Sequence, residues 1–140
     1  MIVRKISDVE PVEWGNGTSR RYLTTKDGMG YTVTDTLVRA GTRSLLEYKH
    51  HLEACLCIEG SGWVEDTEGN KYRIVPGTIY ALDKHDPHYL VASPHENLRL
   101  ICMFTPALEG HEVHDLSRPG ASVYALPKRS SHADVDRRAA

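Results

Sequence analysis

Long hydrophobic runs are absent from this 140-residue sequence, and no stretch approaches the roughly 20 apolar residues that a membrane-spanning helix needs. An excess of charge is absent too, because 17 basic and 19 acidic residues leave a formal net charge of −2. That balance indicates neither a nucleic acid partner nor a membrane surface. The opening residues 1–6 read as a strand and lack the apolar core of a signal peptide.

Cysteine is scarce, and the three cysteines cannot all pair with one another. Cys55 and Cys57 are two residues apart in an expected strand, so their side chains face the same side. We interpret them first as a buried, reduced pair in a cytoplasmic protein, and second as metal ligands.

Helical periodicity is nearly absent, and short β-branched and aromatic runs alternate with Gly, Asn, Asp and Pro. This pattern predicts a single all-β barrel or sandwich domain over residues 1–127, followed by a disordered polar tail over 128–140. Residues 8–17 are expected to form a loop. The expected strands are residues 2–6, 21–25, 31–39, 54–58, 63–65, 71–75, 78–82, 88–92 and 98–104.

Glycine spacing gives the first sign of a fold family. Gly41, Glu53 and Gly60 fit the first motif of the cupins, which are small double-stranded β-helix barrels, without a gap. The two histidine positions of that motif hold Glu47 and Lys49 instead. The frame therefore resembles a cupin that lacks the usual histidine-rich metal centre.

The second cupin motif begins at Gly77 and ends at His88 in register. Asp83 stands in its proline position and His85 in its second glycine position. We therefore expect the jelly-roll-like cupin barrel, with Glu53 and His88 as the retained metal-site residues.

The residue types within the two motifs are more specific than the spacing of their glycines. Residues 48–60 read Tyr-Lys-His-His-x-Glu-Ala-x-x-Cys-Ile-Glu-Gly, and residues 76–88 read Pro-Gly-x-x-Tyr-x-Leu-Asp-x-His-Asp-x-His. Residues 104–114 read Phe-x-Pro-x-Leu-x-Gly-x-Glu-Val-His. Together these motifs resemble the L-ectoine synthase family over residues 1–115. The resemblance implies an iron-dependent, homodimeric cyclodehydratase that closes N-γ-acetyl-L-2,4-diaminobutyrate to ectoine with loss of water.

By this resemblance the iron ligands are Glu53, Tyr80 and His88. Two oxygen donors with one imidazole suit Fe(II) and leave coordination positions open. The other interpretation of Tyr80 is a barrel-lining aromatic side chain whose hydroxyl has a different partner. His50 and His85 are interpreted as structural or exposed.

The resemblance also implies the residues around the substrate. Glu112 and His114 are two apart on an expected strand and could transfer protons as a pair, with Tyr48 as the third catalytic residue. Arg21 is the expected partner of the substrate carboxylate, because its planar guanidinium offers two parallel hydrogen bonds. The expected substrate-binding residues are Arg21, Thr36, Tyr48, His51, Phe104 and Trp14.

Three departures from the family pattern concern substrate recognition. Gly17 stands where the family has tryptophan, so either Trp14 reaches into the gap or the aromatic wall is missing. Thr34 stands where a larger polar residue is expected, and the longer segment 115–124 is expected to close the mouth of the barrel. The alternatives are a related enzyme acting on another acylated diamino acid, or a cupin that binds a small molecule without turnover.

Overall fold

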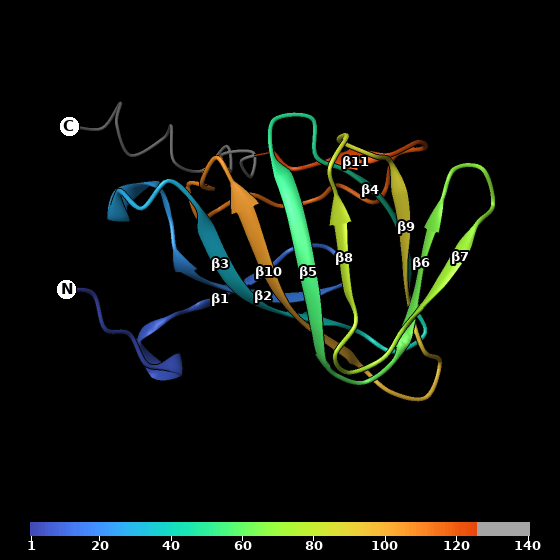
Figure 1. The fold of residues 1–140 in the computed structure, drawn as a ribbon, viewed down its shortest axis with the longest axis horizontal. Coiled ribbons are helices and arrows are strands. Elements are labelled where there is room, and N and C mark those ends of the chain that lie inside the picture. Colours follow the sequence, from blue (N-terminus) through green and yellow to red (C-terminus); the bar gives the residue numbers. More distant parts are fainter. Residues whose placement is uncertain (126–140) are drawn as a thin grey trace, which may run out of the picture.

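The computed structural model describes residues 1–125, which form two facing β-sheets (Figure 1). The all-β prediction is confirmed. The six-stranded sheet has the order β1 (Pro11–Glu13), β2 (Gly17–Leu23), β3 (Thr32–Val38), β10 (Leu98–Thr105), β5 (Leu52–Glu59), β8 (Ile79–Leu82). The five-stranded sheet has the order β11 (Ser122–Val123), β4 (Arg43–Glu47), β9 (His88–Ala92), β6 (Gly62–Asp66), β7 (Lys71–Ile74). Neighbouring strands are antiparallel except β11 and β4.

Two single-turn 3-10 helices, η1 (Ile6–Asp8) and η2 (Thr25–Asp27), flank the first strands. Neither is long or apolar enough to cross a membrane, and no other helix occurs in residues 1–125.

Strict alternation decides which side chains enter the space between the sheets. On β3 the buried residues are Thr32, Thr34, Thr36 and Val38, which are those that the alternation predicts to share one face. The inward face of β5 carries Glu53 beside two cysteines, whereas that of β10 is apolar apart from the thiol of Cys102. The core along the six-stranded sheet therefore contains polar side chains that are shielded from bulk water.

Register aligns one row of inward side chains across five strands. Arg21 of β2 lies opposite Thr34, Thr34 opposite Cys102, Cys102 opposite Cys55, and Cys55 opposite Tyr80 of β8. Residues far apart in the sequence are thus fixed on one face at neighbouring-strand spacing. This row crosses the candidate site from one end to the other.

The motif glycines occupy turns that need a left-handed backbone. At Gly60, φ is 78° and a Cβ would lie 1.9 Å from the Asn97 carbonyl oxygen, so no other residue fits without a backbone shift. His85, in the second glycine position of the other motif, has φ 54°. The expected cupin frame is therefore present even where its residue types differ.

Several expected boundaries were wrong. Residues 1–5 form no strand, because nothing pairs with their backbone in the part of the chain that the structure describes. The strand expected over 21–25 is β2, which already begins at Gly17 and ends before η2, and β1 lies within the expected loop 8–17. β4 was not predicted. The expected tail at 128–140 lies outside the described residues.

Candidate active site

A small cavity of about 20 Å³ lies between the two sheets. Six of the expected site residues line it: Trp14, Thr36, Tyr48, Glu53, Tyr80 and Phe104. Strand alternation accounts for this gathering, since each of the strand residues among them occupies an inward position. The structure therefore brings two of the three expected metal residues and four of the six expected substrate-binding residues to one cavity, whereas His88, Arg21 and His51 do not line it.

Glu53 enters this cavity from β5 and is only 6% exposed. Burial raises its pKa to about 8, since a desolvated carboxylate is costly without a compensating charge. No ion pair to Glu53 occurs within residues 1–125. A divalent cation would supply the missing charge.

His88, at the start of β9, is 2% exposed. Its Nδ1–H donates to the Asp86 carbonyl oxygen at 3.0 Å, which leaves the lone pair on Nε2. Nε2 is buried and has no hydrogen-bond partner among the described residues. Burial also lowers the pKa of His88, so its imidazole is neutral. An oriented neutral imidazole with a free nitrogen is the form that binds a metal.

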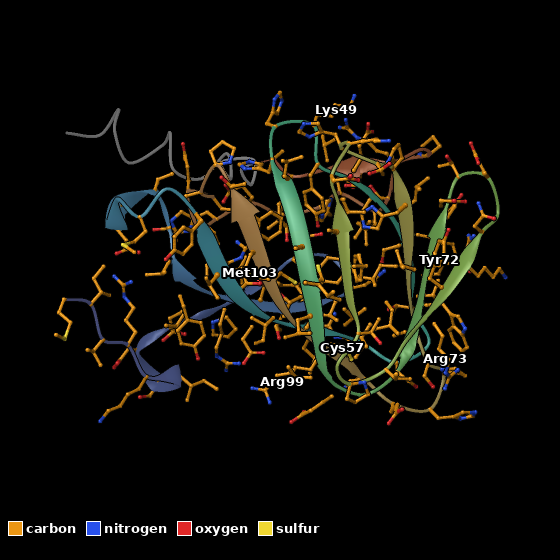
Figure 2. The ribbon with its side chains drawn as sticks, in the orientation of Figure 1. Lys49, Cys57, Tyr72, Arg73, Arg99 and Met103 are labelled. Atoms are coloured by element: carbon orange, nitrogen blue, oxygen red, sulfur yellow. The ribbon has the colours of Figure 1, made fainter. Side chains whose placement is uncertain are left out.

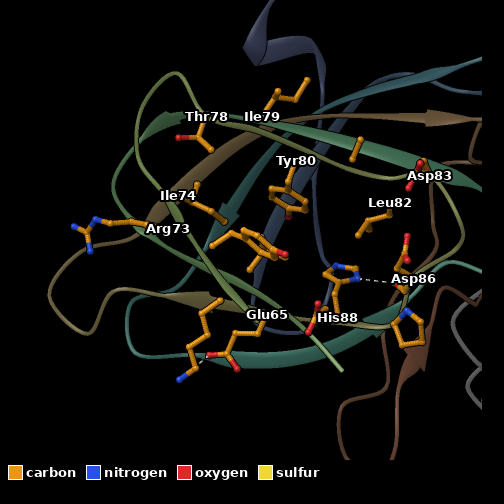
Figure 3. A pocket seen from close by; sticks show the side chains of 16 residues that line it. Glu65, Arg73, Ile74, Thr78, Ile79, Tyr80, Leu82, Asp83, Asp86 and His88 are labelled. Carbon is orange, nitrogen blue, oxygen red and sulfur yellow. Dashed lines mark hydrogen bonds and ion pairs between the residues drawn. The ribbon is translucent and has the colours of Figure 1, made fainter. Parts of the chain in front are cut away.

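Tyr80 lies beside His88, with ring centroids 6.3 Å apart. Both residues also line an outer groove of about 670 Å³ between β8 and the β6–β7 hairpin, in which Figure 3 shows their side chains and the His88–Asp86 hydrogen bond. Burial raises the pKa of the Tyr80 hydroxyl well above its usual value. A carboxyl, a phenol and the free nitrogen of His88 fit the oxygen-rich ligand set expected for iron.

Tyr48 lines the cavity, and its hydroxyl contacts His114 behind it. His114 Nε2 lies 3.2 Å from the Tyr48 hydroxyl, and Nδ1 lies 3.0 Å from the Ser122 hydroxyl. Burial, together with the neighbouring His88 and the positive charge of Arg21, lowers the pKa of His114 to about 3. The ring is therefore neutral and can accept a hydrogen bond from one hydroxyl while donating one to the other.

Arg21 is buried at 6% exposure and forms no ion pair in the described part of the chain. It donates to the carbonyl oxygens of Gly110 and Glu112 at 3.0 and 2.8 Å, and to the Ser19 hydroxyl at 3.1 Å. Its remaining hydrogen bond is a long one, 3.4 Å, to the Tyr124 hydroxyl, and the guanidinium carbon lies 5.5 Å from the centroid of the same ring. A buried cation held by neutral oxygens is suited to an incoming carboxylate.

Glu112 is placed differently from the expectation. Its carboxylate accepts hydrogen bonds from the backbone N–H groups of Glu109 and Gly110, both at 2.8 Å. Burial raises its pKa, but these hydrogen bonds and the nearby charge of Arg21 outweigh burial and lower it overall. Within residues 1–125 no hydrogen bond joins Glu112 to His114. The two are close in sequence but are not an assembled pair here.

Thr36 and Trp14 form the part of the cavity wall that lies near Arg21. The Thr36 hydroxyl lies 3.0 Å from that of Ser19 and 2.8 Å from that of Thr34. Trp14 is 2% exposed, donates from Nε1 to the Leu37 carbonyl oxygen and meets the His114 ring edge-on. Trp14 therefore provides an aromatic wall next to Gly17.

The other histidines and the two cupin histidine positions lie at the edge of the site. The half-buried His51 donates from Nδ1 to the Pro106 carbonyl oxygen and packs near Phe104. His50 is exposed, and His85 Nδ1 contacts the carbonyl oxygens of Tyr48 and His51. Of the residues in the histidine positions, Glu47 is half-buried and Lys49 is exposed on the loop after β4 (Figure 2).

The sequence pattern did not single out Tyr124 or Ser122, and it did not pair Cys55 with Cys102, which lies opposite it on β10. The Tyr124 ring packs on His114, Tyr48 and Phe104 at centroid distances of 4.2, 5.0 and 5.8 Å. The expectation that segment 115–124 covers the barrel mouth was the only available signal. The ring's position depends on the long connection from β10, which sequence pattern does not specify.

Comparisons with known proteins identify the family of the chain. The family model described as ectoine synthase matches residues 1–128. An L-ectoine synthase of Bordetella petrii is 45% identical over 95% of this chain and all of that protein. The crystal structure of the ectoine synthase from P. lautus superimposes with a TM-score of 0.75 at 39% identity, covering 94% of both chains.

A third protein supports the fold alone. The polyketide cyclase RemF from Streptomyces resistomycificus is 18% identical, with a TM-score of 0.66 over 94% of this chain and 88% of its own. The cupin fold prediction is confirmed, and the length and identity of the other matches decide the family. The chain belongs to the ectoine synthase family.

Proposed function

We propose that this chain closes N-γ-acetyl-L-2,4-diaminobutyrate to ectoine and water, with Fe(II) held by Glu53, Tyr80 and His88. The family makes the chain an enzyme, a hydro-lyase of ectoine biosynthesis. The observation that carries the proposal is the buried Arg21, which forms no ion pair in the described chain and lies at the β2 end of the inward row that ends at Tyr80 on β8. An amino acid substrate supplies the carboxylate that this arrangement lacks.

The reaction joins two ends of one molecule. The α-nitrogen bonds to the acetamide carbon, the bond between that carbon and its oxygen breaks, and the oxygen leaves as water with two protons that the nitrogens give up. Because ring closure is intramolecular, holding the chain folded can account for much of the acceleration. A narrow cavity between two rigid sheets meets that requirement.

Substrate entry requires Tyr124 to move. A cavity of about 20 Å³ has room for about one water molecule and none for an acylated diamino acid. The Tyr124 hydroxyl stands 3.4 Å from Arg21 Nη2, where a carboxylate would bind. The substrate therefore displaces the Tyr124 ring and takes over its contact with Arg21.

Proton transfer is assigned to Tyr48 and His114. Burial raises the pKa of Tyr48 well above its usual value, so its hydroxyl remains protonated and can donate to the reacting oxygen. The neutral His114 behind it donates a hydrogen bond from Nε2–H to the Tyr48 oxygen, which leaves the Tyr48 proton free for the reacting oxygen. Glu112 acts as a base only after the substrate loosens its hydrogen bonds to Glu109 and Gly110.

When bound, iron supplies Lewis acidity toward the substrate's amide oxygen. Glu53 and Tyr80 provide oxygen donors, and His88 provides its free Nε2. Hydrogen bonding of His88 Nδ1 to the Asp86 carbonyl fixes the ring orientation that this ligand needs.

The decisive experiment supplies anaerobically iron-loaded enzyme with N-γ-acetyl-L-2,4-diaminobutyrate and measures ectoine by chromatography. Wild type should form ectoine, whereas Arg21→Gln should raise KM at least 10-fold because a charge-assisted bond to the carboxylate is lost. Glu112→Gln should lower kcat by about 100-fold with little change in KM. No ectoine from folded, iron-loaded enzyme would refute the proposal. Equal effects of Glu112→Gln on kcat and KM would make Glu112 a substrate anchor.

We also propose a cytoplasmic homodimer. The three buried free cysteines suit a reducing compartment. Leu56 and Ile79, which pair across β5 and β8, remain 36% and 60% exposed on the outer face of the six-stranded sheet. Light scattering should give twice the chain mass, and Ile79→Glu should lower it to that of a monomer.

A further inference from the structure

Two thiols face the cavity beside Glu53, and the proposed function uses neither. Cys55 follows Glu53 by two residues on β5, so both side chains point inward. Cys102 of β10 lies directly opposite Cys55. All three residues are at most 6% exposed and line the same cavity.

Their ligand atoms are already close together. One carboxylate oxygen of Glu53 and the sulfur atoms of Cys55 and Cys102 lie within 4.8 Å of one another. Two thiolates bound tetrahedrally at about 2.3 Å lie roughly 3.8 Å apart, so modest side-chain rotations would bring these atoms onto one ion. The cavity beside them offers about 20 Å³ of space.

We propose that Glu53, Cys55 and Cys102 form a second, thiol-containing metal subsite that takes a thiophilic divalent cation such as Zn²⁺. Each thiol that becomes a ligand gives up its proton, and two sulfurs with one oxygen are a donor set that Zn²⁺ accepts readily. The rigid antiparallel pairing of β5 with β10 fixes both sulfurs on the same side.

The subsite shares Glu53 with the proposed iron site, so the two ions compete. An ion held by the thiols draws the Glu53 carboxylate toward the β10 side of the cavity and away from Tyr80 on β8. Iron prefers the oxygen and imidazole donors of Glu53, Tyr80 and His88, whereas Zn²⁺ gains from the two sulfurs. Cys55 and Cys102 thus lower the selectivity of this enzyme for iron.

Cobalt(II) tests the subsite without any turnover, because a thiolate bound to cobalt gives an intense near-ultraviolet charge-transfer absorption. Wild-type protein titrated anaerobically with Co²⁺ should show this absorption and saturate near one ion per chain. Cys55→Val and Cys102→Val should each weaken Co²⁺ and Zn²⁺ binding at least 10-fold and remove part of the absorption. Cys57→Val is the matched control, because Cys57 is equally buried on β5 but its sulfur contacts the Glu59 and Gly60 carbonyls.

Circular dichroism and thermal melting establish that each variant is folded. If Cys55→Val does not fold, Cys55→Ser and Cys102→Ser replace the valine variants. The proposal is overturned if wild type gives no thiolate absorption, or if the absorption persists unchanged in folded Cys55 and Cys102 variants. Ectoine formation is measured separately on the iron-loaded enzyme, so activity without the cobalt signal refutes only the subsite. A cobalt signal without ectoine formation refutes only the proposed function.

Discussion

Replacing Tyr124 with alanine should open the substrate cavity. The Tyr124 ring contacts three other aromatic rings, those of His114, Tyr48 and Phe104. Each such contact contributes about 0.5–1.5 kcal/mol, and taking the lower part of that range gives about 2 kcal/mol for the closed position. That free energy corresponds to an open fraction of about 3%, so KM for the substrate should fall by about 30-fold in Tyr124→Ala.

The turnover number should change in the opposite sense. An open cavity admits water, which weakens polar contacts inside and loosens the folded substrate, so kcat should fall. Initial rates over a range of substrate concentrations separate the two effects. Tyr124→Phe is the control, because it keeps the ring and loses only the 3.4 Å contact with Arg21, and its KM should stay within about threefold of wild type.

The reasoning is refuted if folded Tyr124→Ala shows an unchanged or increased KM. That outcome would mean that Tyr124 contacts the bound substrate as part of the wall. Thermal melting of each variant distinguishes either result from loss of the fold.

Three further predictions concern the metal, acid stability and the aromatic wall. His88→Ala should abolish stoichiometric iron binding, measured by metal analysis after anaerobic loading, and full retention of iron would place the site elsewhere. Burial lowers the pKa of His114 to about 3 from its ordinary 6.5, so the unfolded state binds more protons between these values. This contribution to stability should therefore be complete above about pH 6.5 and fall by up to about 1.4 kcal/mol per pH unit below it. His114→Gln should flatten this dependence in urea titrations, and an unchanged pH profile would refute the assignment. Gly17→Trp should destabilise the protein, because a Cβ would lie 1.8 Å from the Leu37 carbonyl oxygen. Trp14→Ala should raise KM, because Trp14 provides the aromatic wall of the cavity. A stable Gly17→Trp variant with a lower KM would show that Trp14 does not provide this wall.

Local sequence pattern determined the parts of the fold that depend on single strands and tight turns. The alternation from Thr32 to Val38 is buried as its period of two requires, because one face of a strand must leave water. Gly60 could be anticipated from spacing, since the left-handed turn and the close Asn97 carbonyl admit no side chain. The resemblance also named Glu53 and His88, both of which are buried in the structure.

Residues 1–5 show where local pattern fails. Their β-forming composition predicted a strand, but a strand needs a partner edge, and the described chain offers none to them. β4 was overlooked for the converse reason, because its five residues acquire a strand conformation by pairing with β9 and β11. Pairing is a property of the whole sheet and cannot be read from one segment.

The chemistry of the site depended most on tertiary structure. Sequence spacing placed Glu112 next to His114, but the carboxylate turns to two backbone N–H groups that only the loop conformation brings within reach. Tyr124 reaches the cavity through the connection after β10, and Cys55 meets Cys102 only because β5 and β10 pair in this register. Sequence by itself determined which chemical groups this protein carries and which face of each strand they occupy, whereas packing between the sheets decided which groups touch, because those contacts join residues distant in the chain.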